Sequence, residues 1–176
     1  MKKILLFTLI AVAFSSCKNL VPYTDHLKAE HKWSIEQVKH IQFYLSHEIL
    51  VQRKLVGGTS DKIHGKVVTQ HGEQFDQIYF KKGLKVGMID VTSNNNYIIQ
   101  CESQEGNTLT FGVNPNKNGK FVLLASEWIG QKGKVHYADT EYYTNEESAE
   151  SCLLIDLRQA VDEQNNFRVA GGYKVK

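Results

Sequence analysis

The chain has 176 residues, with 21 lysine and arginine residues against 19 aspartate and glutamate residues. Removing residues 1–16 as a signal peptide leaves 160 residues and takes away Lys2 and Lys3, so the mature chain is formally neutral. A neutral chain gives no electrostatic case for binding nucleic acid or anionic lipid, and its length fits one domain with a hydrophobic core.

The N-terminus has the pattern of a secretory signal peptide. Lys2 and Lys3 form a positive start, and an apolar stretch at 4–14 follows, with Thr8 as its only hydroxyl. As a helix this stretch would extend about 16 Å, against about 30 Å for the hydrocarbon core of a bilayer. It is therefore too short to span a membrane.

Cys17 stands where a lipoprotein would be lipidated. Phe14-Ser15-Ser16-Cys17 resembles a bacterial lipobox, in which the cysteine thiol receives a diacylglyceryl group before the signal peptide is removed and the new amine can be acylated. Phe14 departs from this pattern, in which Leu is usual. Two or three acyl chains, at about 0.8 kcal/mol per buried methylene, anchor a protein stably. The alternative is a soluble secreted protein that is cut near Ser16 with Cys17 unmodified.

Residues 17–33 are expected to be a lipidated N-terminus and tether that passes into short helical structure. Pro22 disfavours early regular structure, and Thr24 is a candidate N-cap. Ser34-Ile35-Glu36-Gln37 has the form of a capping box and predicts a helix of about two turns.

From Ile41 onward, short β-favouring runs alternate with turns rich in Gly and Asn. A spacing of roughly 8–12 residues between turns predicts an all-β domain at 34–176, mainly antiparallel, as a barrel or a sandwich with a short N-terminal helix. The predicted strands are 41–45, 49–56, 66–70, 75–81, 86–92, 97–102, 108–113, 121–126, 134–137, 141–144, 152–157 and 167–169.

Two of these runs have a further signal. Residues 121–125 lack alternation of apolar and polar side chains, which predicts a central strand covered on both faces. Residues 153–161 begin as a strand, but Leu154, Leu157 and Val161 also fit helical spacing, which allows a strand that ends in a helical turn.

Cys101 and Cys152 are the cysteines that remain besides Cys17, in a compartment where disulfides persist. A bridge between them would close a loop of about 50 residues and contribute on the order of 4 kcal/mol. Strand phase argues against the bridge, because it places Cys101 on the core face and Cys152 on the outer face. The alternative is that both are unpaired cysteines that act as small hydrophobic residues.

Candidate metal sites are weak. Glu36 and His40 lie four residues apart on the predicted helix, but neither a second histidine at the required spacing nor a cysteine cluster completes a zinc site. Residues 114–119 have the oxygen-bearing pattern of half a calcium loop, yet Lys117 adds positive charge and Ala125 stands where a bidentate Glu would be needed. A hairpin loop is the better interpretation, and no metal or cofactor is expected.

Residues 139–150 carry five acidic side chains and no basic one, which favours a mobile solvated loop over a cation site or a surface for a basic partner. A nucleophile elbow, a phosphate-binding glycine loop, a Cys-His pair and a dinucleotide fingerprint do not occur in the sequence. The sequence therefore predicts no catalytic residue.

Several segments of the mature chain carry a resemblance to a known group. The runs at 41–46, 51–55, 121–128, 133–137 and 142–144 resemble a group of small uncharacterised lipoproteins of Bacteroidota-type bacteria, which implies an outer-membrane lipoprotein but brings no activity. In such bacteria, surface export is associated with acidic residues soon after the lipidated cysteine. Lys18, Asn19, Leu20 and Val21 follow Cys17 here, which favours a periplasm-facing protein.

The function predicted from these signals is a non-catalytic binding or scaffolding role with an envelope partner. A carrier that holds a small apolar ligand inside a β-barrel is the alternative. An envelope hydrolase ranks last.

Overall fold

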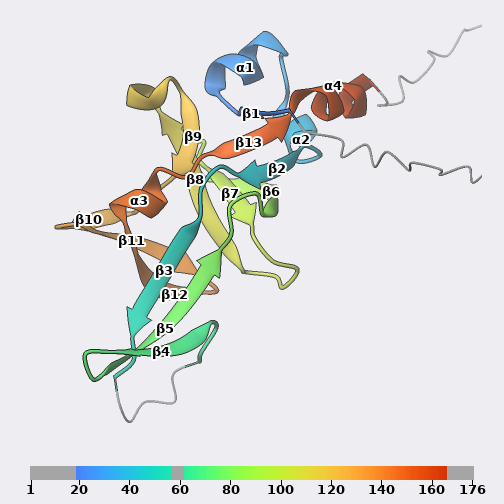
Figure 1. Cartoon of the computed structure of the whole chain (residues 1–176). Helices are drawn as coiled ribbons and strands as arrows, with labels where there is room; N and C mark the ends of the chain where they lie inside the picture. The colour runs from blue at the N-terminus through green and yellow to red at the C-terminus, as the bar shows by residue number, and fades with distance from the viewer. Residues whose placement is uncertain (1–18, 57–61, 166–176) are drawn as a thin grey trace, which may run out of the picture.

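The computed structural model describes residues 19–56 and 62–165, and these residues form two antiparallel sheets (Figure 1). Sheet A runs in the order β1 (Leu20–Pro22), β13 (Leu153–Asp156), β2 (Gln42–Leu45), β6 (Lys85–Val91), β7 (Tyr97–Gln100), β8 (Thr108–Asn114) and β9 (Lys120–Leu123). Sheet B runs in the order β10 (Glu127–Ile129), β11 (Lys132–Tyr137), β12 (Thr140–Asn145), β3 (Ile49–Lys54), β5 (Glu73–Phe80) and β4 (Lys66–Gln70).

The helices are short and lie at the margins of the sheets. They are α1 (Asp25–Glu30), α2 (Ile35–Val38), the 3₁₀ helix η1 (Pro115–Lys117), α3 (Glu146–Ala149) and α4 (Leu157–Asn165). In Figure 1, α1, α2 and α4 gather around β1 and β13 at one end of the molecule, whereas the hairpin of β4 and β5 forms the other end.

The all-β prediction is confirmed, and of its two alternatives the architecture is sandwich-like instead of a closed barrel. The chain passes from sheet A to sheet B after β2 and again after β9, and β11 of sheet B packs against β8 of sheet A. The predicted strands match β2 to β9 and β11 to β13 within a few residues, except that the predicted strand at 167–169 lies outside the described residues.

Two short strands were not predicted. β1 contains Pro22, which suits an edge position, and β10 has three exposed residues with no buried face to create an alternating pattern. Both strands form because a longer neighbour supplies their hydrogen bonds, β13 for β1 and β11 for β10.

The segment expected to be a tether is instead folded into the domain. β1 pairs with β13 through Leu20 opposite Asp156, and Tyr23, which follows β1, is fully buried. Thr24 caps α1 as predicted, by accepting a hydrogen bond from the backbone N–H of Leu27 at 3.0 Å. The domain therefore begins near residue 20, because the core needs Tyr23.

Tyr23 is the centre of an aromatic cluster in the hydrophobic core that sheet A borders. Its ring centroid lies 5.1 Å from those of Phe43 and Phe121, and Tyr97 stacks on Phe121 at 4.3 Å. The hydroxyl groups of Tyr23 and Tyr97 are 3.2 Å apart, so each polar atom has a partner inside the core. Trp33 closes the cluster by stacking against Tyr23.

The prediction for residues 121–125 is half right. Phe121, Val122 and Leu123 of β9 are all buried, so both faces of the strand are covered. However, β9 is the last strand of sheet A and not a central one. Isolated bridges join Lys120 to Thr24 and Val122 to Cys152, so the segments around Thr24 and Cys152 lie along its outer edge.

The start of α2 and the junction between β13 and α4 agree with the local signals of the sequence. The capping box of Ser34 and Gln37 is present, but α2 is a single turn because the chain enters β2 at Gln42. The strand at 153–156 continues directly into α4, which confirms the predicted change from strand to helix.

Candidate functional site

The outer face of sheet B is the surface with the most pronounced chemistry. Alternation along each strand turns Tyr142, Val51 and Ile78 inward and leaves Tyr143, Gln52 and neighbouring polar residues on the outer face. Cross-strand register then aligns Lys134, Tyr143, Gln52 and Gln77 in one row across four strands.

A groove crosses the middle of this row at Tyr143 and Gln52, and we call it the sheet B groove. It consists of two pockets of about 340 and 210 Å³ that share Gln52, Lys132 and Tyr143. Lys54, Glu73, Phe75 and Ile129 complete the first pocket, and Leu50, Gln131, Thr144 and Asn145 complete the second.

One wall of the groove is the hairpin of β10 and β11. Gly133 has no side chain, and a Cβ atom there would lie 3.0 Å from ring atoms of Trp128. The Trp128 ring can therefore lie over Gly133, opposite it in the register, while Ile129 is 54% exposed and lines the groove. The exposed Ile129 side chain gives this wall an apolar character, whereas Trp128 points to the opposite face of the sheet and lines neither pocket.

The floor of the groove carries paired polar groups. Gln77 donates from Nε2 to Oε1 of Gln52 at 2.8 Å, which leaves the Nε2 group of Gln52 without a hydrogen bond to any described residue. Lys54 and Glu73 form an ion pair at the end of the first pocket. Side-chain amides offer donors and acceptors together, and half-buried Phe75 and Tyr143 offer ring faces. These groups suit a bound molecule with a polar, uncharged segment.

A charged cluster borders the groove. The Nζ of Lys134 lies 3.3 Å from Glu141 and 3.5 Å from Glu127, and the hydroxyl of Tyr143 donates to Glu141 at 2.9 Å. The hydrogen bond from Tyr143, together with Lys134, lowers the pKa of Glu141, and the hydrogen bond to Glu141 raises the pKa of Lys134. The cluster holds the ring of Tyr143 in place beside Gln52.

Asp76 lies on the opposite face of sheet B and is fully buried. Its carboxylate accepts hydrogen bonds from the backbone N–H groups of His64 and Gly65 at 3.1 and 2.8 Å, from the Tyr142 hydroxyl at 2.8 Å and from Arg53 Nε at 3.4 Å. Burial alone would raise the pKa of Asp76, but these hydrogen bonds together lower it below its usual value. Burial and then Asp76 raise the pKa of Tyr142 to about 12.

The arrangement around Asp76 is structural. Two of the donors, His64 and Gly65, directly precede β4, and the other two, Arg53 and Tyr142, belong to strands β3 and β12 of sheet B. Asp76 therefore fixes the segment that enters β4 to the sheet. A Cβ atom at Gly65 would lie 2.1 Å from the carbonyl oxygen of Gln77, so only glycine allows this close approach.

Glu102 makes a second polar cluster between the sheets. Its Oε2 accepts hydrogen bonds from the Tyr137 hydroxyl and from the Asn107 side-chain amide, both at 2.7 Å. Burial raises the pKa of Tyr137, and the hydrogen bond to Glu102 raises it further. Ala138 donates to the carbonyl oxygen of Gly106 at 3.2 Å, so this cluster joins the loop after β7 to the turn after β11.

The two cysteines of the domain are separate free thiols, and the structure forms no bridge between them. Cys101 is buried, as strand phase predicted. Cys152 is also buried, at 5% exposure, although strand phase placed it on the outer face. The expectation for Cys152 was wrong because it precedes β13 and pairs with Val122, so β9 covers it.

The structure does not gather the candidate metal ligands of the sequence into a metal site among the residues it describes. Among the residues that the structure describes, no group of three or more His, Cys, Asp and Glu side chains could hold a metal ion. His31 stacks on Trp33 at 4.7 Å between ring centroids, and His47 Nδ1 lies 2.8 Å from the Ser46 hydroxyl. Residues 114–119 form the hairpin loop that was predicted, with η1 between β8 and β9.

The acidic segment at 139–150 is not the mobile loop that its charge favoured, and the strand predicted at 141–144 is present as β12. Most of it forms β12 and α3, and Asn145 caps α3 by accepting a hydrogen bond from the N–H of Ser148. Glu141 pairs with Lys134, and Glu150 pairs with Lys117. Lys134 of the neighbouring strand β11 and Lys117 of η1 neutralise these two carboxylates, which is why a count of charge within residues 139–150 was misleading.

Cys17 and the signal peptide predicted at 1–16 lie outside the described residues. No helix of residues 19–56 and 62–165 is long and apolar enough to cross a membrane. The sequence does not predict the sheet B groove, because its residues come from five strands and the turn before β11 and form no motif along the chain. The adjacent Tyr142 and Tyr143 in the predicted strand at 141–144 are a local signal for one part of it.

Comparison with models of protein families, with curated proteins and with solved structures finds no match. The case for a function therefore depends on the lipobox of the sequence and on the geometry of the site.

Proposed function

We propose that this chain is a lipoprotein of the bacterial envelope that is anchored through Cys17 and binds another envelope component without catalysis. The observation that carries the binding role is the sheet B groove, where amide groups and aromatic rings are held ready on a rigid sheet. Rigid elements present a binding surface at low entropic cost. The lipobox at 14–17 supplies the anchor, and the absence of acidic residues directly after Cys17 favours the periplasmic side of the outer membrane.

The packed interior supports a binding role over the carrier alternative. The hydrophobic core beside sheet A is filled by aromatic rings in contact with one another, those of Tyr23, Phe43, Tyr97 and Phe121. A carrier needs apolar space at that position. The buried carboxylate of Asp76 is likewise fully used in structural hydrogen bonds, which gives no support to a hydrolase.

Fractionation of cells tests the anchor. Wild-type protein should sediment with membranes, and Cys17→Ser should move to the soluble fraction, since the signal peptide and the folded domain are otherwise unchanged. Undiminished membrane association of Cys17→Ser would overturn the lipoprotein proposal.

Site-specific photocrosslinking in intact cells tests the groove. A photoreactive amino acid at Gln52 or Gln131 should give a defined adduct with the bound component, whereas the same group at exposed Asp90 of sheet A should give none. Tyr143→Ala should reduce the adduct at Gln131, because the groove loses a ring face. Equal crosslinking from Asp90 and Gln131 would contradict a specific site in the groove.

A further inference from the structure

The folded domain begins almost at the anchor. Asn19 is exposed and directly precedes β1, whose three residues pair with β13, and Tyr23 is fixed in the core. Three peptide units separate Cys17 from Leu20, so the chain between them can extend at most about 10 Å. A lipid on Cys17 would therefore hold the start of β1 at the surface of the bilayer.

A groove opens at this end of the domain, between β1 and α4. It has a volume of about 430 Å³. Half-buried Val21, Leu157 and Val161 form its apolar part. Asn19 and His31 add polar groups beside β1 and α1.

The charges of this groove are one arginine and two aspartates. Arg158, Asp156 and Asp162 all line it, and none of them takes part in an ion pair within residues 19–56 and 62–165. A guanidinium group matches the geometry of a phosphate, and a carboxylate matches an ammonium group. This set complements a zwitterionic phospholipid headgroup, which carries both groups, better than an anionic headgroup.

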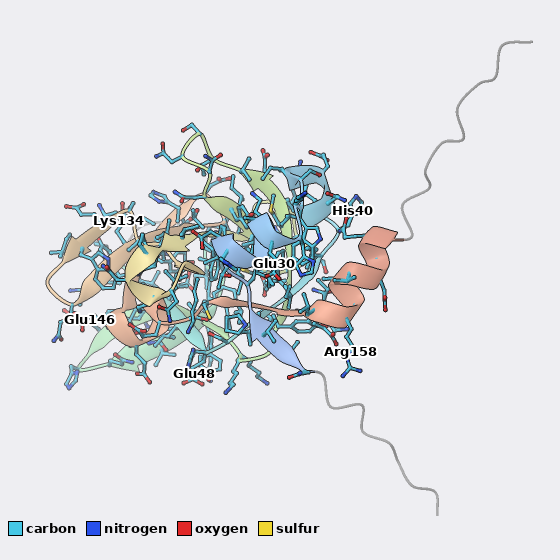
Figure 2. The ribbon with its side chains drawn as sticks, turned by 90° about the horizontal axis from the view of Figure 1, so that it is seen from above. Glu30, His40, Glu48, Lys134, Glu146 and Arg158 are labelled. Carbon is cyan, nitrogen blue, oxygen red and sulfur yellow. The ribbon has the colours of Figure 1, made fainter. Side chains whose placement is uncertain are left out.

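We infer that the end of the domain formed by β1 and α4 is a membrane-docking face, whose groove binds zwitterionic phospholipid headgroups of the bilayer that holds the anchor. This inference rests on the proposed lipidation of Cys17. Figure 2 shows Arg158 at this end, whereas Lys134, beside the sheet B groove, lies at the opposite end of the molecule. Docking would thus point the sheet B groove away from the bilayer and toward soluble envelope components.

Fluorescence quenching in vesicles tests the orientation. The full lipidated protein is reconstituted in vesicles of phosphatidylethanolamine and phosphatidylcholine that contain a lipid with a nitroxide on its headgroup. A fluorophore on Gln159→Cys, next to Arg158, should be quenched several-fold more than one on Glu146→Cys, which lies at the opposite end (Figure 2). Equal quenching at the two positions would overturn the docking face.

A longer tether separates binding by the groove from mere proximity. With a flexible Gly-Ser segment inserted between Lys18 and Asn19, quenching at Gln159→Cys should persist and should fall several-fold on adding Arg158→Glu. Lys66→Glu makes the same change of charge on exposed β4, at the other end of the molecule (Figure 1), and should leave quenching at Gln159→Cys unchanged. Persistent quenching in the Arg158→Glu protein, or stronger quenching in phosphatidylglycerol vesicles, would overturn headgroup binding by this groove.

The same samples distinguish the docking face from the anchor. Sedimentation with vesicles that depends on Cys17 reports lipidation, and quenching reports orientation. Protein that sediments without preferential quenching at Gln159→Cys overturns the docking face alone, whereas protein that does not sediment overturns the anchor and, with it, the inference.

Discussion

Asp76 is the residue on which the connection between β3 and β4 depends. In Asp76→Asn, an amide N–H₂ group would face donors from Gly65, His64 and Tyr142 that now meet a carboxylate. We expect a loss of about 3 kcal/mol in the free energy of unfolding, because buried donors would be left without acceptors. Urea denaturation measures this loss.

Asp90→Asn is the matched control for Asp76→Asn. Asp90 is exposed on β6 and, within residues 19–56 and 62–165, its side chain accepts a hydrogen bond only from the neighbouring N–H of Val91, so its substitution should cost less than about 0.5 kcal/mol. Similar losses for the two variants would contradict the structural role of Asp76.

Asp76 also predicts how stability depends on pH. Because its pKa is lower in the folded state than the value of about 3.9 in an unfolded chain, its ionised form stabilises the fold above about pH 4. This contribution is lost as the pH falls through the folded pKa. The free energy of unfolding should therefore fall less steeply between about pH 4 and pH 2 in Asp76→Asn than in the wild type. Parallel curves from denaturation at each pH would exclude this linkage.

The thiols of Cys101 and Cys152 are predicted to be inert in the folded protein. Burial raises the pKa of Cys101 to about 12, with a further contribution from the charge of Glu102 and a partial offset from a backbone hydrogen bond at Leu109. A thiol reagent at pH 8 should leave the native protein almost unmodified and should label two thiols after unfolding without reductant. Labelling of none in the unfolded protein would indicate a bridge that the structure does not contain.

At the scale of elements, β1 is predicted to be indispensable. A chain that starts at Ser34 lacks β1, α1, Tyr23 and Trp33, so the aromatic cluster loses its centre and β13 loses its edge partner. We expect this chain to show no cooperative thermal transition, whereas a chain that starts at Asn19 should unfold cooperatively. Near-UV circular dichroism follows the packed aromatic rings directly. A cooperative transition in the shorter chain would show that residues 20–33 are a tether after all.

For the whole molecule, the proposed lipid anchor and the neutral charge of the chain after residue 16 together predict how the protein attaches to a membrane. The acidic and basic residues are equal in number after residue 16, so electrostatic attraction to a charged bilayer should contribute little. High salt should leave the protein on the membrane, and a mild detergent should release it by dissolving the lipids around the acyl chains. Release by salt alone would point to attachment through a charged surface.

The sequence by itself determined the features that depend on neighbours along the chain. Turns rich in Gly and Asn at regular spacing indicated the all-β class, and Ser34 with Gln37 indicated the start of α2, because both signals are local in origin. The lipobox around Cys17 is likewise a contiguous pattern. The short distance between Cys17 and the folded domain, in contrast, is set by the start of β1 at Leu20.

Tertiary structure decided whatever depends on residues distant in the sequence. Tyr23 became a core residue because β13 and β9 surround it, Cys152 became buried because it pairs with Val122, and Glu150 became paired because the fold brings Lys117 of η1 beside it. The two grooves arose in the same way, from side chains of separate strands and of α4 that only the register of the sheets brings together. A pattern along the chain gives periodicity and exposure, but the register that joins distant strands is set by the packing of the whole core.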